Sequence, residues 1–147
     1  MTPVRSVLDT NIIVSGLLWG GPPSKLIDVY IPRGLLKVCT SPPLISETYR
    51  VLEDSKFSLR VLQVGLNVRS SLTTIYADAE IYADIPPVSA IKEDPSDNAV
   101  LATALAAKAD NIISGDKHLR RLKFYEGIDI LTASEALRKL QKGPSAV

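Results

Sequence analysis

The chain has 147 residues, of which 46% are hydrophobic and 22% charged, a composition sufficient for one domain with its own hydrophobic core. Its 17 lysines and arginines nearly balance its 16 aspartates and glutamates, so the net charge gives no general attraction to nucleic acid or to an anionic membrane, and any such affinity must come from local clusters. One cysteine, Cys39, and one histidine, His118, exclude a disulfide framework within the chain and leave too few ligands for a structural zinc site.

Location and domain organisation follow from simple patterns. The first residues, MTPVRS, lack the charged and then apolar order of a signal peptide, and no apolar run is long enough to cross a membrane, so we expect a cytoplasmic protein. We expect residues 1–142 to form a single domain and residues 143–147 to be a disordered tail. Cys39 lies inside the apolar segment LLKVCT, which predicts a core thiol.

The chain begins with a predicted strand followed by two predicted helices. Residues 4–8, VRSVL, are predicted to form a short strand, and residues 11–18 hold enough apolar side chains for a mostly buried helix. The sequence GGPP at 20–23 ends this helix. Ser24 is then placed to cap a second helix that continues to about residue 30.

The middle of the chain predicts two more strands and two more helices. Residues 35–40 are strand-like, and Ser41 is expected to cap the next helix because the two prolines after it are tolerated in a first helical turn. The spacing of apolar residues predicts a helix over 58–73. The sequence EIYAD at 80–84 predicts a short strand, and IPPV at 85–88 breaks the regular structure.

The clearest helix is predicted at 94–109, with Asp94 at its cap, Pro95 in its first turn and strong helix formers after them. A strand, a turn into a short helix, a final strand and a terminal helix are then expected at 111–114, 115–122, 128–131 and 132–142. Thr132 and Glu135 have the spacing of a capping box at the start of the last helix.

This alternation of strands and helices predicts an α/β fold with a parallel sheet covered on both faces. In such sheets ligands bind at the edge formed by the carboxyl ends of the strands. Acidic residues gather at that edge. Asp9 and Asp116 follow short strands, and Asp94 and Asp97 begin the clearest helix. Glu47 lies about a turn and a half into the helix that follows the strand LLKVCT.

Helix capping is a second explanation for most of these acids. Asp9 and Asp116 could each cap the helix that follows, and Asp94 and Asp97 could form a cap pair at the positive end of a helix dipole. For Asp94 we prefer this explanation. Capping leaves Glu47 with no role beyond a solvated helix face, and it does not explain why the acids fall at one edge.

Carboxylates that converge repel one another, and such a site either takes up protons or binds a cation. Oxygen ligands select a hard ion, so three or four acids suit one or two Mg²⁺ or Mn²⁺ ions. Such ions lower the pKa of a water for attack on phosphorus and neutralise charge on phosphoryl oxygens. The acids therefore predict a metal-dependent phosphodiesterase site that needs no histidine or cysteine nucleophile.

Four segments in order resemble the PIN-domain family of metal-dependent nucleases: VLDTN, SPPLISETYRVL, DPSDN with AVLATALAAKAD after it, and NIISGDKHL. The resemblance covers essentially the whole chain. It implies a three-layer α/β/α domain with a short central parallel sheet covered by helices. The family's catalytic metal ligands fall on the acids at Asp9, Glu47, Asp97 and Asp116. Supporting roles fall on Thr10, Asn11, Asp94 and Ser114.

One position departs from the family pattern. Many members carry another aspartate two positions beyond the last ligand, where this chain has His118, which puts firm binding of a second metal in doubt. His118 could contact a substrate phosphate instead, although a solvated surface role is the preferred interpretation.

A basic group follows Asp116 and is a candidate RNA-binding surface beside the acids. It consists of Lys117, His118, Arg120, Arg121 and Lys123. A solvated helix face explains these residues equally well.

Aromatic residues are only 5% of the chain, which argues against a base-stacking platform for nucleic acid. We expect Trp19 to be a core or dimer contact rather than an exposed anchor for a partner.

Three functions are consistent with this pattern. The first is a Mg²⁺- or Mn²⁺-dependent endoribonuclease with a metal-activated water as nucleophile. The resemblance further implies a toxin of a toxin–antitoxin pair, with RNA as substrate, an antitoxin protein as partner, a homodimer and no membrane. The second is an inactive nuclease-like scaffold that binds RNA or a protein. The third, a phosphatase with Asp9 as covalent nucleophile, lacks the second aspartate that such enzymes place two residues on, because Asn11 stands there.

Overall fold

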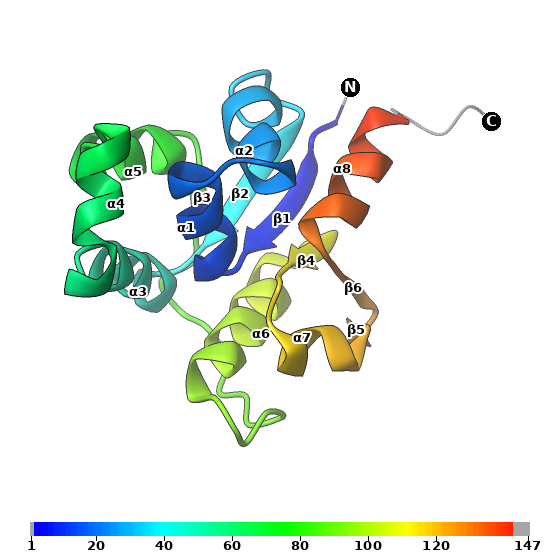
Figure 1. Cartoon of the computed structure of the whole chain (residues 1–147). Coiled ribbons are helices and arrows are strands. Elements are labelled where there is room, and N and C mark those ends of the chain that lie inside the picture. The colour runs from blue at the N-terminus through cyan, green and yellow to red at the C-terminus, as the bar shows by residue number, and fades with distance from the viewer. Residues whose placement is uncertain (1, 143–147) are drawn as a thin grey trace.

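The computed structural model describes residues 2–142 and contains the expected alternation of strands and helices (Figure 1). The strands are β1 (Val4–Leu8), β2 (Leu36–Thr40), β3 (Glu80–Ile81), β4 (Asn111–Ile113), β5 (Phe124–Tyr125) and β6 (Ile128–Leu131). The helices are α1 (Thr10–Leu18), α2 (Pro22–Lys25), α3 (Pro42–Leu52), α4 (Ser58–Val64), α5 (Val68–Tyr76), α6 (Pro95–Ala107), α7 (Lys117–Leu122) and α8 (Ala133–Gln141). A π-helical turn, η1 (Leu26–Tyr30), continues α2, and a 3₁₀ turn, η2 (Ser55–Phe57), precedes α4.

Two expectations concern the ends of the chain and membranes. The tail expected at 143–147 lies outside the described residues. Within residues 2–142, no helix combines the length and the apolar character needed to cross a bilayer.

The strands form one sheet in the order β3-β2-β1-β4-β6-β5. Every neighbouring pair is parallel except β5 and β6, so the predicted α/β fold with a parallel sheet is confirmed. The antiparallel strand β5 was not predicted. It is two residues long and begins after Lys123, and the chain then reverses into β6 at Glu126 and Gly127, whose φ values are 50° and 79°.

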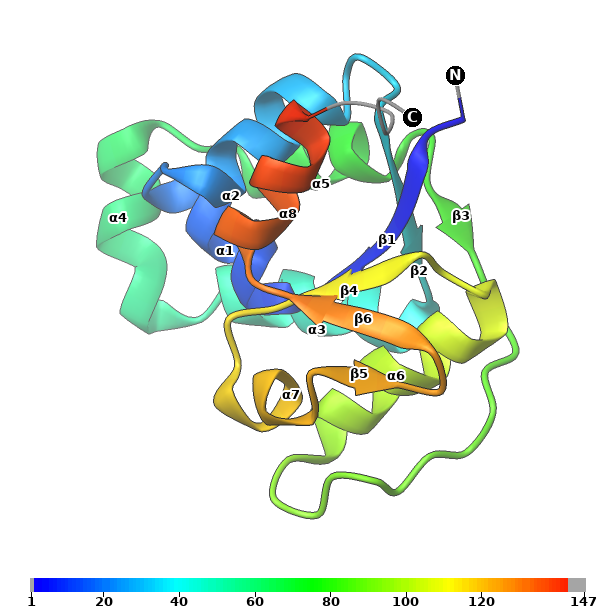
Figure 2. The same cartoon turned by 90° about the vertical axis from the view of Figure 1, so that its right-hand side faces the viewer.

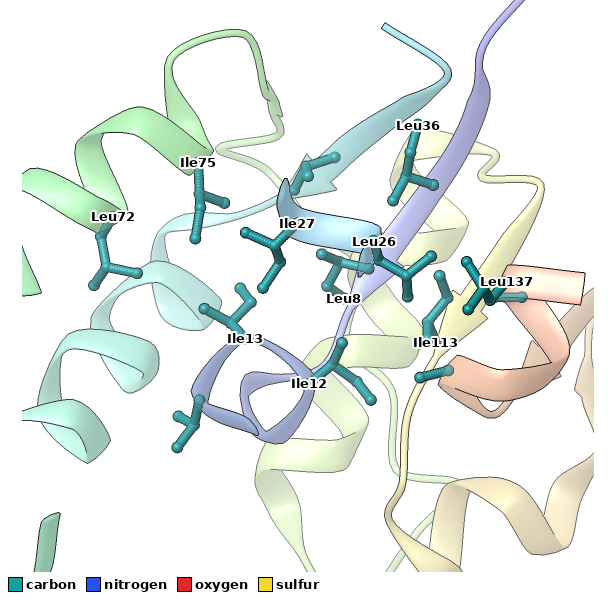
Figure 3. Packing of buried hydrophobic residues seen from close by; sticks show 14 of the residues in the cluster. Leu8, Ile12, Ile13, Leu26, Ile27, Leu36, Leu72, Ile75, Ile113 and Leu137 are labelled. Atoms are coloured by element: carbon teal, nitrogen blue, oxygen red, sulfur yellow. The ribbon is translucent and has the colours of Figure 1, made fainter. Parts of the chain in front are cut away.

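The sheet is covered on both faces because neighbouring residues of a strand point to opposite sides. Leu8 and Ile113 face a core shared with α1, η1 and α8 (Figure 3). Val7 and Ile112 face a second core shared with α6 and α7. Figure 2 shows α1, α2 and α8 on one side of the sheet and α6 and α7 on the other. Cys39 is fully buried in the second core, as expected.

Two predicted helix boundaries are wrong. Helix α2 begins at Pro22 and not after Ser24, because two prolines already set the backbone of a first helical turn. Ser24 lies inside the helix, where its Oγ donates to Asp28 Oδ2 at 2.9 Å. The helix predicted over 58–73 is two helices, since Gly65 adopts a left-handed conformation with φ 67° and ends α4.

Ser41 does precede α3, as expected, but its side chain does not cap the helix. Its Oγ lies 2.7 Å from Thr103 Oγ1 and joins α3 to α6. The predicted caps at Asp94 and at Thr132 are confirmed, the latter as a complete capping box with Glu135.

Candidate metal centre

The five acids named above come together in one pocket of about 390 Å³. We call it the acidic pocket and define it by Asp9, Glu47, Asp94, Asp97 and Asp116. Asp9 ends β1, Asp116 follows β4, and the other three lie on or directly before helices α3 and α6. Because β1 and β4 are parallel neighbours, their carboxyl ends open on the same edge of the sheet.

Asp9 is buried and held from both sides. Its Oδ1 accepts a hydrogen bond from the backbone N–H of Thr10 at 2.8 Å, and its Oδ2 accepts one from Ser114 Oγ at 2.7 Å. Ser114 Oγ in turn accepts the N–H of Asp116 at 2.9 Å. A single buried serine therefore links the acids that end two neighbouring strands.

Glu47 of α3 also lines the pocket and is largely buried, with 20% of its side chain exposed. Thr10 Oγ1 donates to Glu47 Oε2 at 3.3 Å and also lies 3.1 Å from Thr48 Oγ1. Arg50, one turn further along α3, is 3.7 Å from Glu47 and mostly exposed, so it compensates the charge only weakly. Glu47 does not lie on a solvated helix face.

The other three acids form a compact group that we call the aspartate triad: Asp94, Asp97 and Asp116. One carboxylate oxygen from each lies within 4.8 Å of the others. Asp94 Oδ1 caps α6 by accepting the N–H of Ser96 at 3.0 Å, and Asp116 Oδ1 caps α7 by accepting the N–H of His118 at 2.7 Å. Capping and ligand binding are thus compatible, because each cap uses one oxygen and leaves the other.

Asp97 is the acid that capping does not explain. It is 2% exposed, and its Oδ2 is buried without a hydrogen-bond partner among the described residues. Burial, and after it the charges of Asp116, Asp94 and Asp9, raise the pKa of Asp97 to about 8. Burial also raises the pKa of Asp9 to about 6, with Ser114 and Thr10 opposing the shift. A buried carboxylate surrounded by others is stable only with a proton or a cation.

This donor set fits a hard divalent cation. All the side chains that converge are carboxylates, which favour Mg²⁺ or Mn²⁺ over ions that prefer nitrogen or sulfur. Asp97 offers one carboxylate oxygen to the aspartate triad, and its Oδ2 is buried without a hydrogen-bond partner among the described residues. A cation bound there would satisfy it.

A family comparison agrees with this geometry. The sequence model of one protein family, described as the PIN domain, matches residues 5–118 of this chain. The chain belongs to the PIN-domain family. This PIN domain is similar in structure to VapBC2 from Rickettsia felis, crystallised with a DNA fragment from their promoter, with a TM-score of 0.55 and 14% sequence identity. The match covers 88% of this chain and 98% of that chain, and at this identity it shows a shared fold. No match was found among curated proteins.

The fold of the PIN domain groups the acids differently from the sequence prediction of which acids bind metal and which support them. Asp94 was expected only as a supporting residue, yet it belongs to the triad while Asp9 and Glu47 lie outside that compact group. The three-residue interval between Asp94 and Asp97 at a helix start was the signal that could have placed both acids together. Asn11, another supporting residue, is exposed, and its Oδ1 lies 3.5 Å from the N–H of Gly115.

The predicted RNA-binding residues occupy the surface of α7. Lys117, Arg120, Arg121 and Lys123 are exposed, and His118 is half-buried. None of these five residues lines the acidic pocket. The lysine that does line it is Lys56 of η2, which the sequence analysis did not consider.

Trp19 was expected in the core or at a dimer contact. The core interpretation is wrong, because 56% of the residue is exposed. Trp19 lines the acidic pocket together with Phe57, and it lies at the end of α1 opposite Asp9. The sequence suggested a buried Trp19 because it follows the apolar residues of α1, most of which are buried.

Proposed function

We propose that this PIN domain is a divalent-metal-dependent ribonuclease that hydrolyses RNA phosphodiester bonds. One observation carries the proposal: a buried carboxylate of Asp97 without a partner, within reach of oxygens from Asp94 and Asp116. Such a group of charges is unfavourable in the protein alone, and it becomes favourable with one or two Mg²⁺ or Mn²⁺ ions.

Each acid has a role that follows from its surroundings. Asp97 and Asp116 each offer a ligand oxygen, and Asp94 adds a third from its cap position, all within 4.8 Å of one another. Asp9 and Glu47 face them across the pocket, with Ser114 and Thr10 fixing their orientation. When bound, the ions would lower the pKa of a water and neutralise the developing charge on the phosphoryl oxygens.

The test is RNA cleavage by the purified, metal-stripped protein with and without Mn²⁺. Cleavage should require the ion and fall at least about 100-fold in Asp9→Asn and in Asp97→Asn, with circular dichroism unchanged. Asp129→Asn is the matched control, because Asp129 is an exposed acid on β6 that pairs only with Lys139 at 3.6 Å. Full activity in the Asp9→Asn, Asp97→Asn double variant would refute the assignment.

The same proposal extends to a biological role. We propose that this protein is the toxin of a toxin–antitoxin pair, acts in the cytoplasm as a homodimer and is silenced by a partner protein. The support is membership of the PIN-domain family and the shared fold with VapBC2. Expression of the wild-type chain should arrest growth, and expression of Asp97→Asn should not. Light scattering of the pure protein measures the dimer.

A nuclease-like scaffold that does not cut is the second candidate. It is favoured by His118, which stands where many family members have an acid, while the aspartate triad alone offers enough oxygens to bind an ion. Calorimetry showing Mn²⁺ binding, together with intact RNA after incubation with the loaded protein, would establish this second function. Phosphodiester cleavage coupled to Mn²⁺ binding would exclude it.

A further inference from the structure

The acidic pocket has a second end that is aromatic. Trp19, at the end of α1, and Phe57, in η2, line the same pocket as the acids. We call this pair the aromatic rim. Fully exposing a large aromatic side chain forgoes the free energy of burying it, yet Trp19 is 56% exposed. An exposed tryptophan beside a candidate catalytic site requires an explanation in terms of what it contacts.

The tryptophan ring is held in place by its neighbours. Its centroid lies 5.8 Å from that of Phe57, with an interplanar angle of 71°, so Phe57 supports Trp19 in an edge-to-face contact. The guanidinium carbon of Arg60 lies 5.7 Å from the Trp19 ring centroid. Arg60 is itself fixed, because its Nε donates to the carbonyl oxygen of Leu18 at 2.8 Å. The flat ring of Trp19 is therefore held in a fixed position, with the ring of Phe57 at 71° to it.

A continuous wall joins the rim to the acids. Val14 and Ser15 of α1 line the pocket between them. Trp19 lies nine residues after Thr10, which corresponds to about 13 Å along the axis of α1. Lys56 also lines the pocket, with its Nζ 5.1 Å from the Phe57 ring centroid. From the triad outward, the pocket thus offers a cation site, a polar and apolar wall, and an aromatic surface with a positive charge beside it.

One kind of ligand matches both ends: a chain of phosphates that carries flat heterocycles. We propose that the aromatic rim stacks a nucleobase of the RNA strand whose scissile phosphate lies at the acids, and that Lys56 attracts a phosphate next to that base. This inference rests on the proposed ribonuclease function and names the substrate contacts of that site. A single stacked base requires no extended platform, so the low aromatic content of the chain is compatible with it.

Trp19 is the single tryptophan of the chain, so it reports on its own contact. The probe is a short single-stranded RNA added in Ca²⁺ on ice, with a gel to show that it remains intact. Stacking on a base should quench the tryptophan fluorescence in a saturable way. The matched probe is an oligomer of the same length and charge that lacks its bases. It should quench little, and equal quenching by the two oligomers would overturn the proposal.

Variants separate stacking from folding. Trp19→Ala should weaken binding of fluorescein-labelled RNA, measured by anisotropy, by roughly 5- to 100-fold, and Trp19→Phe should restore most of it. Leu62→Ala is the matched control, because Leu62 is 77% exposed on α4 and does not line this pocket. In the cleavage assay, Trp19→Ala should raise KM much more than it lowers kcat. Unchanged RNA affinity in Trp19→Ala would overturn the proposal and leave the rim to a protein partner.

The outcome is distinguishable from failure of the ribonuclease assignment. Quenching by base-containing RNA, without cleavage in Mn²⁺, would support the stacked base while refuting the nuclease. Cleavage in Mn²⁺ with an unchanged KM in Trp19→Ala and no quenching would support the nuclease and refute the stacked base.

Discussion

Two carboxylates at the sheet, Glu80 and Asp97, show opposite behaviour. Glu80 of β3 accepts hydrogen bonds from Arg5 Nη2 at 2.6 Å and from Tyr82 Oη at 2.9 Å. The Arg5 guanidinium, followed by the Tyr82 hydroxyl, lowers the pKa of Glu80. Asp97 in the acidic pocket has a raised pKa and an unpartnered oxygen. One acid is neutralised by the protein, and the other is not.

The difference separates a structural role for Glu80 from the metal-binding role that we propose for Asp97. Arg5 on β1 and Glu80 on β3 lie two strands apart in the sheet, so their ion pair ties a two-residue edge strand to the centre. That cluster is complete in the protein alone. The acidic pocket gathers five acids with weak compensation from the exposed Arg50 beside Glu47 and from Lys56 on its lining. This excess of negative charge lowers stability unless a ligand binds, and such a loss of stability is typical of sites that bind or react.

The largest expected effect is on the pH dependence of stability without metal. In the folded state the pKa values of Asp97 and Asp9 are raised to about 8 and about 6, above those of the unfolded chain. The stability that they contribute at low pH is therefore lost as the pH rises through 6 and 8. In EDTA, the melting temperature should fall by roughly 10 °C between pH 5 and pH 9. A melting temperature that is constant or rises over this range would contradict the raised pKa values.

The next largest effect is stabilisation by metal. Mn²⁺ at about 100 times its dissociation constant should raise the free energy of unfolding by about 2.7 kcal/mol, or the melting temperature by roughly 5 to 10 °C. Asp97→Asn should lose this shift, whereas Glu80→Gln should keep it, because Glu80 lies outside the acidic pocket. Thermal melting at fixed pH measures both. An equal shift in the two variants would place the ion elsewhere.

A smaller effect tests whether Asp94 does more than cap α6. Asp94→Asn keeps the side-chain oxygen that accepts the N–H of Ser96 and removes the negative charge. We expect a Mn²⁺ affinity about tenfold weaker, measured by calorimetry, with little change in melting temperature without metal. Asp94→Ala removes both the cap oxygen and the negative charge, so it should lower both the Mn²⁺ affinity and the melting temperature without metal. Wild-type Mn²⁺ affinity in Asp94→Asn would restrict Asp94 to capping.

The smallest effect is on the free energy of unfolding when the charge is removed from either of these two acids, Glu80 or Asp97. At pH 8 in EDTA, Glu80→Gln should lower the free energy of unfolding by about 1 kcal/mol, because it leaves Arg5 with a weaker partner that is partly exposed. Asp97→Asn should raise it, since it removes an unpartnered buried charge. Urea titration measures both changes. A loss of stability in both variants would show that Asp97 is compensated in the protein.

Much of the fold was predictable because its signals are local. The apolar runs of β1, β2, β4 and β6 and the long helix α6 are recognised from neighbouring residues alone, as are the caps at Asp94 and Thr132. The break at Gly65 was missed because a glycine inside a helical pattern does not by itself fix a left-handed backbone. The strand β5 was missed because two residues carry no periodicity, and its existence depends on pairing with β6.

The features of the candidate site also divide into those that local sequence predicts and those that depend on tertiary contacts. By itself, the sequence determined that acids follow the strands, since strand and helix boundaries are written in residues close together along the chain. Only the tertiary structure decided that Asp116 comes within reach of Asp94 and Asp97, and that Trp19 lies exposed in the same pocket. Those relations depend on how helices pack across the sheet, where the contacts join residues that are distant in the chain.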